Sequence, residues 1–243
     1  MLRILPVIRR LWPAVLLTLM GNTLAAAELP APLAAALKQL LTATNYTWGV
    51  TTETPGAPFK VGPYRGRADS AGWVLLETEV GKTSWQVAGQ GSRRVFKTTA
   101  GWITLSEKGS PKGSDLLAVN DLLAAPVPAA ELAALLPALT DLRGEADGSL
   151  VGVIPEDVAK GFITSLVKGR GPGGFTPEFK ISSNRFQLWL TDGRPARYTT
   201  TINATASLPF GKRDLNRITS VEITGYGASP VAVPAEARAK LGL

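Results

Sequence analysis

The 243-residue chain contains no cysteine and no histidine. The absence of cysteine excludes disulfide bonds, thiolate metal sites, thiol nucleophiles and the acylated cysteine of a lipoprotein. The absence of histidine removes the usual general base, every Ser-His-Asp arrangement and the commonest transition-metal ligand. An enzyme with this sequence would have to work with carboxylate, lysine, tyrosine or serine side chains alone. We therefore expect no enzyme activity, no catalytic residue, no metal and no cofactor.

Acidic residues are missing from the first 27 positions, which carry three arginines, an apolar stretch at 14–20 and three alanines before Glu28. This order is typical of a secretory signal peptide that is cleaved near Ala27 and Glu28. It predicts a periplasmic protein that is soluble after cleavage. A retained anchor helix is the alternative, although the apolar run is shorter than the roughly 20 residues that span a bilayer.

The excess of basic residues is small once that segment is set aside. The whole chain has a net charge of +7, and without the three arginines residues 28–243 carry +4. Such a balance gives little support to nucleic-acid binding, and we expect none. No internal repeat or low-complexity linker divides residues 28–243, so we expect them to form a single domain.

Short runs rich in β-branched and aromatic residues are separated by glycine-containing turns, which is typical of an antiparallel meander. The runs lie at 45–54, 73–80, 83–88, 93–99 and 102–106, and again at 149–154, 178–191, 194–206 and 214–226. The Asp192-Gly193 turn between two of these runs is the strongest hairpin signal in the chain.

Helical patterns precede and interrupt these strands, and apolar residues recur in them at helical spacing. The predicted helices lie at 32–43, 115–125, 129–142 and 156–167. Pro126 and Pro128 separate the middle two, and Pro137 should kink or split the second of them. Together the segments predict an α+β fold of about nine or ten strands.

Three motifs associated with catalysis have better structural explanations. The glycine-rich run at 169–174 matches G-x-G-x-x-G, but it follows a predicted helix and precedes a strand, the reverse of the nucleotide-binding order. Ser165 and Lys168 match the S-x-x-K of serine β-lactamases, yet the K-T-G element is missing from its place downstream. Glu77 and Glu79 share a strand face that solvent exposure explains, so a carboxylate-dependent hydrolase is only a rival interpretation.

The basic pairs Arg93-Arg94 and Lys212-Arg213 have no interleaved aromatic residues. We expect both pairs to lie in solvated turns rather than in a binding surface.

Aromatic residues are more informative because they concentrate in the predicted strands, namely Trp48, Trp85, Phe96, Trp102, Phe186, Trp189 and Tyr198. One interpretation is an ordinary core, since strands favour aromatic residues. The other is an open curved sheet with an apolar concave face, which the Ala/Leu-rich helices cover as a lid.

Alternation with a period of two assigns one apolar set to the concave face of such a sheet. The predicted lining of a ligand cavity consists of Val74, Leu76, Val80, Trp85, Val87, Phe186, Leu188, Leu190, Tyr198, Ile202, Val221 and Ile223.

The order of these elements resembles the periplasmic lipoprotein-carrier (LolA-like) superfamily, with the mycobacterial LppX/LprG-type lipid-binding lipoproteins as relatives. Four segments resemble its pattern of strands, helical insertion, hairpin and closing strand: 94–105, 139–158, 186–198 and 221–234. The resemblance implies an open antiparallel half-barrel of about 9–11 strands with helices over its concave face. Two features are not carried over: the acylated cysteine, and an arginine that holds the lid, for which Arg65 and Arg67 offer no decisive motif.

The resemblance implies a non-enzymatic carrier or sensor of lipid or lipoprotein acyl chains. Its expected partner is a lipid or an acylated lipoprotein, envelope membrane proteins are further candidates, and we expect a monomer. The alternative is an envelope structural or interaction protein whose sheet is filled by its own side chains and takes no ligand. The two differ in whether the concave face holds an accessible cavity.

Overall fold

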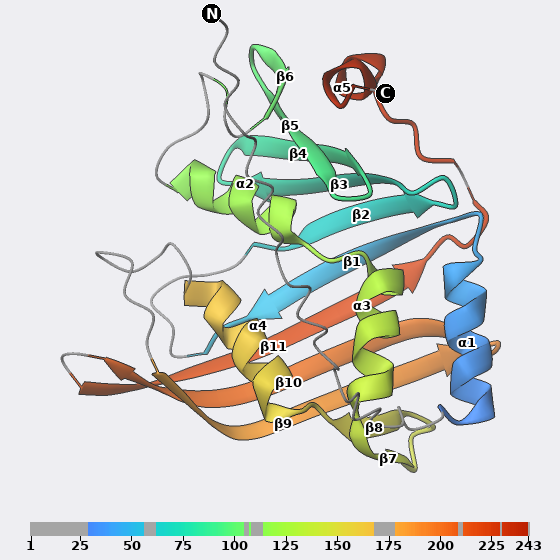
Figure 1. The fold of residues 1–243 in the computed structure, drawn as a ribbon, viewed down its shortest axis with the longest axis vertical. Helices are drawn as coiled ribbons and strands as arrows, with labels where there is room; N and C mark the ends of the chain where they lie inside the picture. The colour runs from blue at the N-terminus through green and yellow to red at the C-terminus, as the bar shows by residue number, and fades with distance from the viewer. Residues whose placement is uncertain are drawn as a thin grey trace, which may run out of the picture.

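The computed structural model describes residues 29–55, 62–104, 107, 114–167, 178–208, 211–228 and 230–242. These residues form a mixed α+β fold with one open antiparallel sheet of eleven strands and five α-helices (Figure 1). The fold class is therefore the one that the sequence predicts. The segments expected to be a signal peptide and a glycine-rich loop, 1–27 and 169–174, lie outside the described residues.

The strands make two meanders that meet in the middle of the sheet. The order is β6-β5-β4-β3-β2-β1-β11-β10-β9-β8-β7, and the first strand of the chain pairs with the last. The strands are β1 Asn45–Glu53, β2 Tyr64–Asp69, β3 Trp73–Val80, β4 Thr83–Gln90, β5 Arg93–Thr98, β6 Gly101–Ile103, β7 Thr140–Gly144, β8 Leu150–Val153, β9 Glu178–Thr191, β10 Arg194–Leu208 and β11 Gly211–Thr224. The Asp192-Gly193 turn joins β9 to β10, and both residues have the positive φ that a two-residue hairpin needs.

Four helices cover one face of this sheet, which we call the inner face. They are α1 Ala31–Leu41, α2 Ser114–Ala124, α3 Pro128–Leu135 and α4 Glu156–Val167, and a 3₁₀ turn, Leu136–Ala138, follows α3. Figure 1 shows them on the same side of the strands. A proline lies in the first turn of α1 and of α3, where the missing N–H costs no helical hydrogen bond.

The inner face carries the main hydrophobic core, as strand alternation requires. On β1 the buried side chains are Tyr46, Trp48 and Val50, and they belong to one cluster with apolar residues of the four helices. Gly66 of β2 makes room for this packing, because a Cβ there would lie 2.2 Å from the ring of Trp48.

A second, smaller core lies on the outer face, where the C-terminal segment covers the β3–β6 end of the sheet. Leu75 and Trp102 pack there against Val231 and Val233, and helix α5, Ala235–Lys240, contributes Ala237. Trp102 is therefore not on the concave side. Trp189 also points to the outer face, since it alternates with the inner Leu188 and Leu190, and the Arg197 guanidinium lies 4.8 Å from its ring centre.

Two parts of the predicted element order were wrong. Strand β2 was missed because Gly66 and flanking arginines interrupt its apolar pattern. The helix predicted at 129–142 ends at Leu135, since Pro137 splits it as expected, and the chain continues into the edge strand β7.

Candidate functional site

The twelve residues predicted to line a cavity lie together on the inner face. Ten are buried in the main core, and Val80 and Leu190 are partly buried against it. The period-two alternation thus assigned these residues to the correct face of the sheet. Their burial also means that most of them face other side chains of this protein rather than open space.

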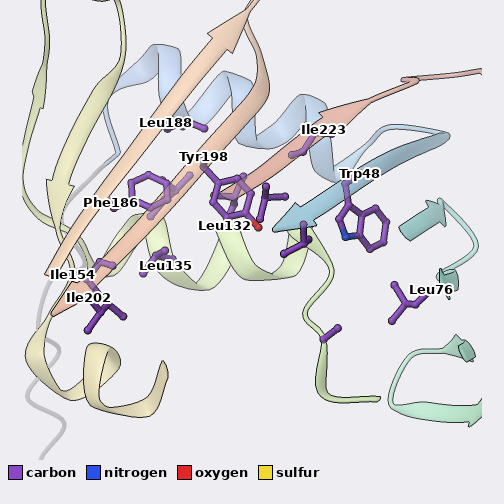
Figure 2. Close-up of a cluster of buried hydrophobic side chains, with 14 of the residues drawn as sticks. Trp48, Leu76, Leu132, Leu135, Ile154, Phe186, Leu188, Tyr198, Ile202 and Ile223 are labelled. Atoms are coloured by element: carbon purple, nitrogen blue, oxygen red, sulfur yellow. The ribbon is translucent and has the colours of Figure 1, made fainter. Parts of the chain in front are cut away.

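Inward side chains are fully buried over β9 and β10, which we call the filled region. Phe186 and Leu188 of β9 and Tyr198 and Ile202 of β10 have exposures of 0–1%. The rings of Phe186 and Tyr198 lie 6.0 Å apart, near Leu132 of α3 (Figure 2). Side chains of the protein therefore fill the place where we expected a ligand.

Open space remains nearer the middle of the sheet, where α2 and α4 cross β1, β2, β3 and β11. A cavity of about 420 Å³ lies there, within the size range of small-molecule sites. Its apolar wall contains Val50, Val80, Ala118, Leu122, Ala124, Ala125, Pro126, Val158, Phe162 and Val221, and its polar wall contains Thr52, Tyr64, Thr78, Asp121, Glu131, Arg217 and Thr219. We call this the open region. Of the twelve predicted residues, Val80 and Val221 line it.

The open region exists because polar residues interrupt the apolar inner rows of several strands. Thr52 of β1 lies opposite Thr219 of β11, and Thr219 lies opposite Thr200 of β10. Tyr64 of β2 lies opposite Thr78 of β3. Threonine and tyrosine at these inward positions break the continuous apolar packing seen over β9 and β10.

Arg217 places a positive charge in the cavity wall. Its side chain lies on the inner face of β11, as do those of Leu215 and Thr219 two positions away on either side. Its Nε donates a hydrogen bond to the Thr219 hydroxyl at 2.9 Å. Its Nη1 donates to the backbone carbonyl of Phe162 in α4 at 2.8 Å. Burial lowers the pKa of Arg217, and the negative charges of Glu131 and Asp121 act in the opposite direction.

Glu131, in the first turn of α3, adds a buried carboxylate to the same wall. The Tyr198 hydroxyl donates a hydrogen bond to its Oε2. Burial raises the pKa of Glu131, against the opposing effects of the Tyr198 hydrogen bond and the Arg217 charge. The cavity therefore combines an apolar wall with two half-buried groups of opposite charge.

A second hollow, of about 530 Å³, lies at the outer face and is mostly polar. Its lining includes Glu77, Glu79 and Glu222. Glu77 accepts from Gln86 at 3.0 Å and lies 3.6 Å from Arg67, while Glu79 is exposed. Both carboxylates thus lie on the solvated side of β3, as their spacing suggested.

The described residues contain no group of three or more carboxylate, histidine or cysteine side chains suited to a metal ion. Within the same ranges no single helix has the length and apolar composition of a membrane span, although the pair 118–124 and 128–138, bent by 61°, meets both criteria together.

No protein-family model and no curated protein matches the sequence. Among solved structures, the chain is similar to a LolA superfamily protein from Nitrosomonas europaea, with 10% sequence identity and a TM-score of 0.28. The match covers 79% of this chain and 90% of that chain. The structural similarity to this superfamily is thus weak.

The predicted lining did not include the polar residues of the cavity, although one signal in the sequence pointed to them. Arg217 and Thr219 have the same parity as Val221 and Ile223, so alternation alone places them on the inner face. Arg94 was expected in a solvated turn, but it is half-buried on β5 with the same parity as the buried Phe96.

Proposed function

We propose that the protein is a non-enzymatic carrier or sensor of lipid or lipoprotein acyl chains, which it holds in the open region. The observation that carries this proposal is the cavity itself. Its apolar wall comes from both the sheet and the helices, so a chain lying there would be enclosed on two sides. Helices α2 and α3 are separated at Pro126 and Pro128 and bent by 61°, which gives a cover made of short rigid pieces.

The free energy at stake explains why such a cavity is useful. Burying one methylene group is worth about 0.8 kcal/mol, so an acyl chain of about sixteen carbons gains about 12 kcal/mol on leaving water. Crossing an aqueous compartment without a carrier is correspondingly slow. A binding protein removes most of this cost by apolar contact alone, which needs no catalytic residue.

We further propose that the protein is exported to the periplasm, that its first 27 residues are removed near Ala27 and Glu28, and that the remainder is soluble and monomeric. Its partners would be a lipid or an acylated lipoprotein and the envelope membrane proteins that deliver or receive it. N-terminal sequencing of protein from the periplasm tests the export step. An intact Met1 or Leu2 on that material would contradict it.

The second candidate is an envelope interaction protein that takes no ligand. It is favoured by the burial of ten of the twelve predicted lining residues in the main core, four of them in the filled region. Under this alternative the open region would hold only water, and no amphiphile would bind with useful affinity.

Titration of delipidated protein with a fluorescent palmitate analogue separates the two candidates. We expect saturable binding to the wild type and a loss of at least tenfold in Val80→Asp, because the new charge would face the alkyl chain at a partly exposed cavity position. Ser84→Asp, an exposed change on the outer face of the same β3–β4 hairpin, is the matched control and should bind normally. A folded, delipidated wild type that binds no probe would contradict the carrier proposal and favour the interaction protein.

A further inference from the structure

A half-buried cation without a counter-charge among the described residues lies beside the α2 wall of the cavity. Arg94 projects from β5 on the inner face, and its Nη2 donates to the backbone carbonyl of Ala125, which lines the cavity, at 3.4 Å. Its Nη1 is buried and has no hydrogen-bond partner in the described parts of the chain. Nor does any described carboxylate form an ion pair with Arg94.

The neighbouring strand is built to accept this side chain. A Cβ at Gly89 of β4, the residue opposite Arg94, would lie 2.9 Å from the Cδ of Arg94. Glycine thus lets the arginine lie across β4 beneath the end of α2. Burial lowers the pKa of Arg94, and among the described groups only Tyr64 opposes that effect.

Tyr64 adds an unused donor in the cavity wall. No described residue forms a hydrogen bond with its hydroxyl, although the ring itself lines the cavity. Burial and the negative charge of Glu131 raise its pKa, against the positive charges of Arg217 and Arg94. Tyr64 therefore lies in the field of both arginines and stays a protonated donor at neutral pH.

The two arginines differ in their compensation. Arg217 faces the negative charges of Glu131 and Asp121 and has hydrogen-bond acceptors on Thr219 and Phe162. Among the described residues, Arg94 has only the one long bond to a backbone carbonyl, and no carboxylate opposes the loss of its hydration. Arg94 is thus the uncompensated cation beside the Tyr64 wall, while Arg217 is balanced.

We propose that the ligand is an amphiphile with a single anionic oxygen group, a carboxylate or a phosphate ester, which accepts from the Tyr64 hydroxyl and compensates the charge of Arg94. Its alkyl chain would then lie along the apolar wall toward Val80 and Val158. A buried donor is satisfied by an acceptor, and a hydrogen bond to a charged group is stronger than one between neutral groups. This inference rests on the proposed function and specifies the class of ligand for the same cavity.

Three probes with the same alkyl chain test it: dodecanoate, dodecyl phosphate and dodecanol, each used to displace a fluorescent fatty acid from the delipidated full-length protein. We expect the wild type to bind at least one anionic probe about tenfold more tightly than dodecanol. The stronger of the two anionic probes identifies the source of the charge. Equal affinity for all three would overturn the inference and leave the proposed function intact. Binding of none of them would overturn both.

Variants sharpen the test through the ratio of anionic to neutral affinity. Arg94→Met should bring this ratio close to one, and Tyr64→Phe should lower it by several-fold. Arg67→Met, which removes a half-exposed arginine of the outer face, is the matched control and should keep the wild-type ratio. Melting curves establish that each variant is folded. If Arg94→Met does not fold, Tyr64→Phe decides, and an unchanged ratio in that folded variant would contradict the proposed head-group site.

Discussion

The filled and open regions lie on the inner face of the same sheet, but their inward side chains differ in polarity and in how they pack against the helices. Over β9 and β10 the inward residues include Phe186, Leu188, Tyr198 and Ile202, which are fully buried in one cluster with apolar residues of the helices. Over β1, β2, β3 and β11, threonine, tyrosine and arginine replace part of that row, and a cavity of about 420 Å³ remains. The difference shows that the same sheet can be filled by side chains at one place and leave a cavity at another. Substitutions should therefore separate stability from binding according to the region they touch.

The largest effect is expected from a charge in the filled region. Leu188→Asp places a carboxylate at a fully buried position without a partner, which costs several kcal/mol and should leave the protein largely unfolded. Circular dichroism and urea titration measure this. The control Thr201→Asp lies on the outer face of β10 opposite Arg185 and should change the free energy of unfolding by about 1 kcal/mol or less. A folded Leu188→Asp that merely loses ligand would show that the filled region is part of the cavity.

Enlarging a side chain should weaken ligand binding when the residue lines the cavity and lower stability when the residue lies in the core. Ala118→Trp on α2 would occupy the cavity, so we expect at least tenfold weaker binding of a palmitate analogue with little change in unfolding free energy. Ala159→Trp on α4, at a position with 0% exposure, overpacks the core and should cost about 1–3 kcal/mol or more. Parallel binding and urea titrations compare the pair. Unimpaired binding by Ala118→Trp would place the ligand elsewhere.

Glu131 joins the two regions, since Tyr198 of the filled region donates to it while it lines the cavity. Burial raises its pKa above the ordinary value of 4.5. The folded protein then keeps a proton that the unfolded chain releases, so this group lowers stability as the pH rises from about 4.5 through the folded-state pKa. Glu131→Gln should remove that component, and urea titrations at several pH values measure it. Identical pH dependence in wild type and variant would show that folding does not shift the pKa of Glu131 and would contradict this expectation.

The smallest effect is expected on the outer face, which belongs to neither region. Arg67 and Glu77 lie 3.6 Å apart with exposed side chains, and such a pair contributes about 0–1 kcal/mol. Arg67→Ala should therefore leave both binding and the urea midpoint nearly unchanged. A marked loss of binding in this variant would point to the outer hollow beside Glu77 as the site.

The sequence supports the fold more fully than the site. Period-two alternation and the Asp192-Gly193 turn are local signals, and they predict nine of the eleven strands, the inward parity and the β9–β10 hairpin. The cavity depends on which inward positions face open space, and this is decided by helices far away in the chain. The contact between Glu131 and Tyr198 joins residues 67 positions apart, and the Arg94 contact to Ala125 joins residues 31 apart. No short-range pattern encodes such contacts, although the inward parity of Arg217 and Arg94 could have drawn attention to both.

The central claim is that an acyl chain lies in the open region and not in the filled one. Photo-crosslinking with a palmitate that carries a diazirine along its chain, followed by peptide mapping, tests this most directly. The predicted result is saturable labelling of peptides that contain Val50–Thr52 and the α2 and α4 positions Ala118, Leu122 and Val158. Labelling of the β9 and β10 peptides around Leu188 and Ile202, or no saturable labelling of folded protein, would contradict it.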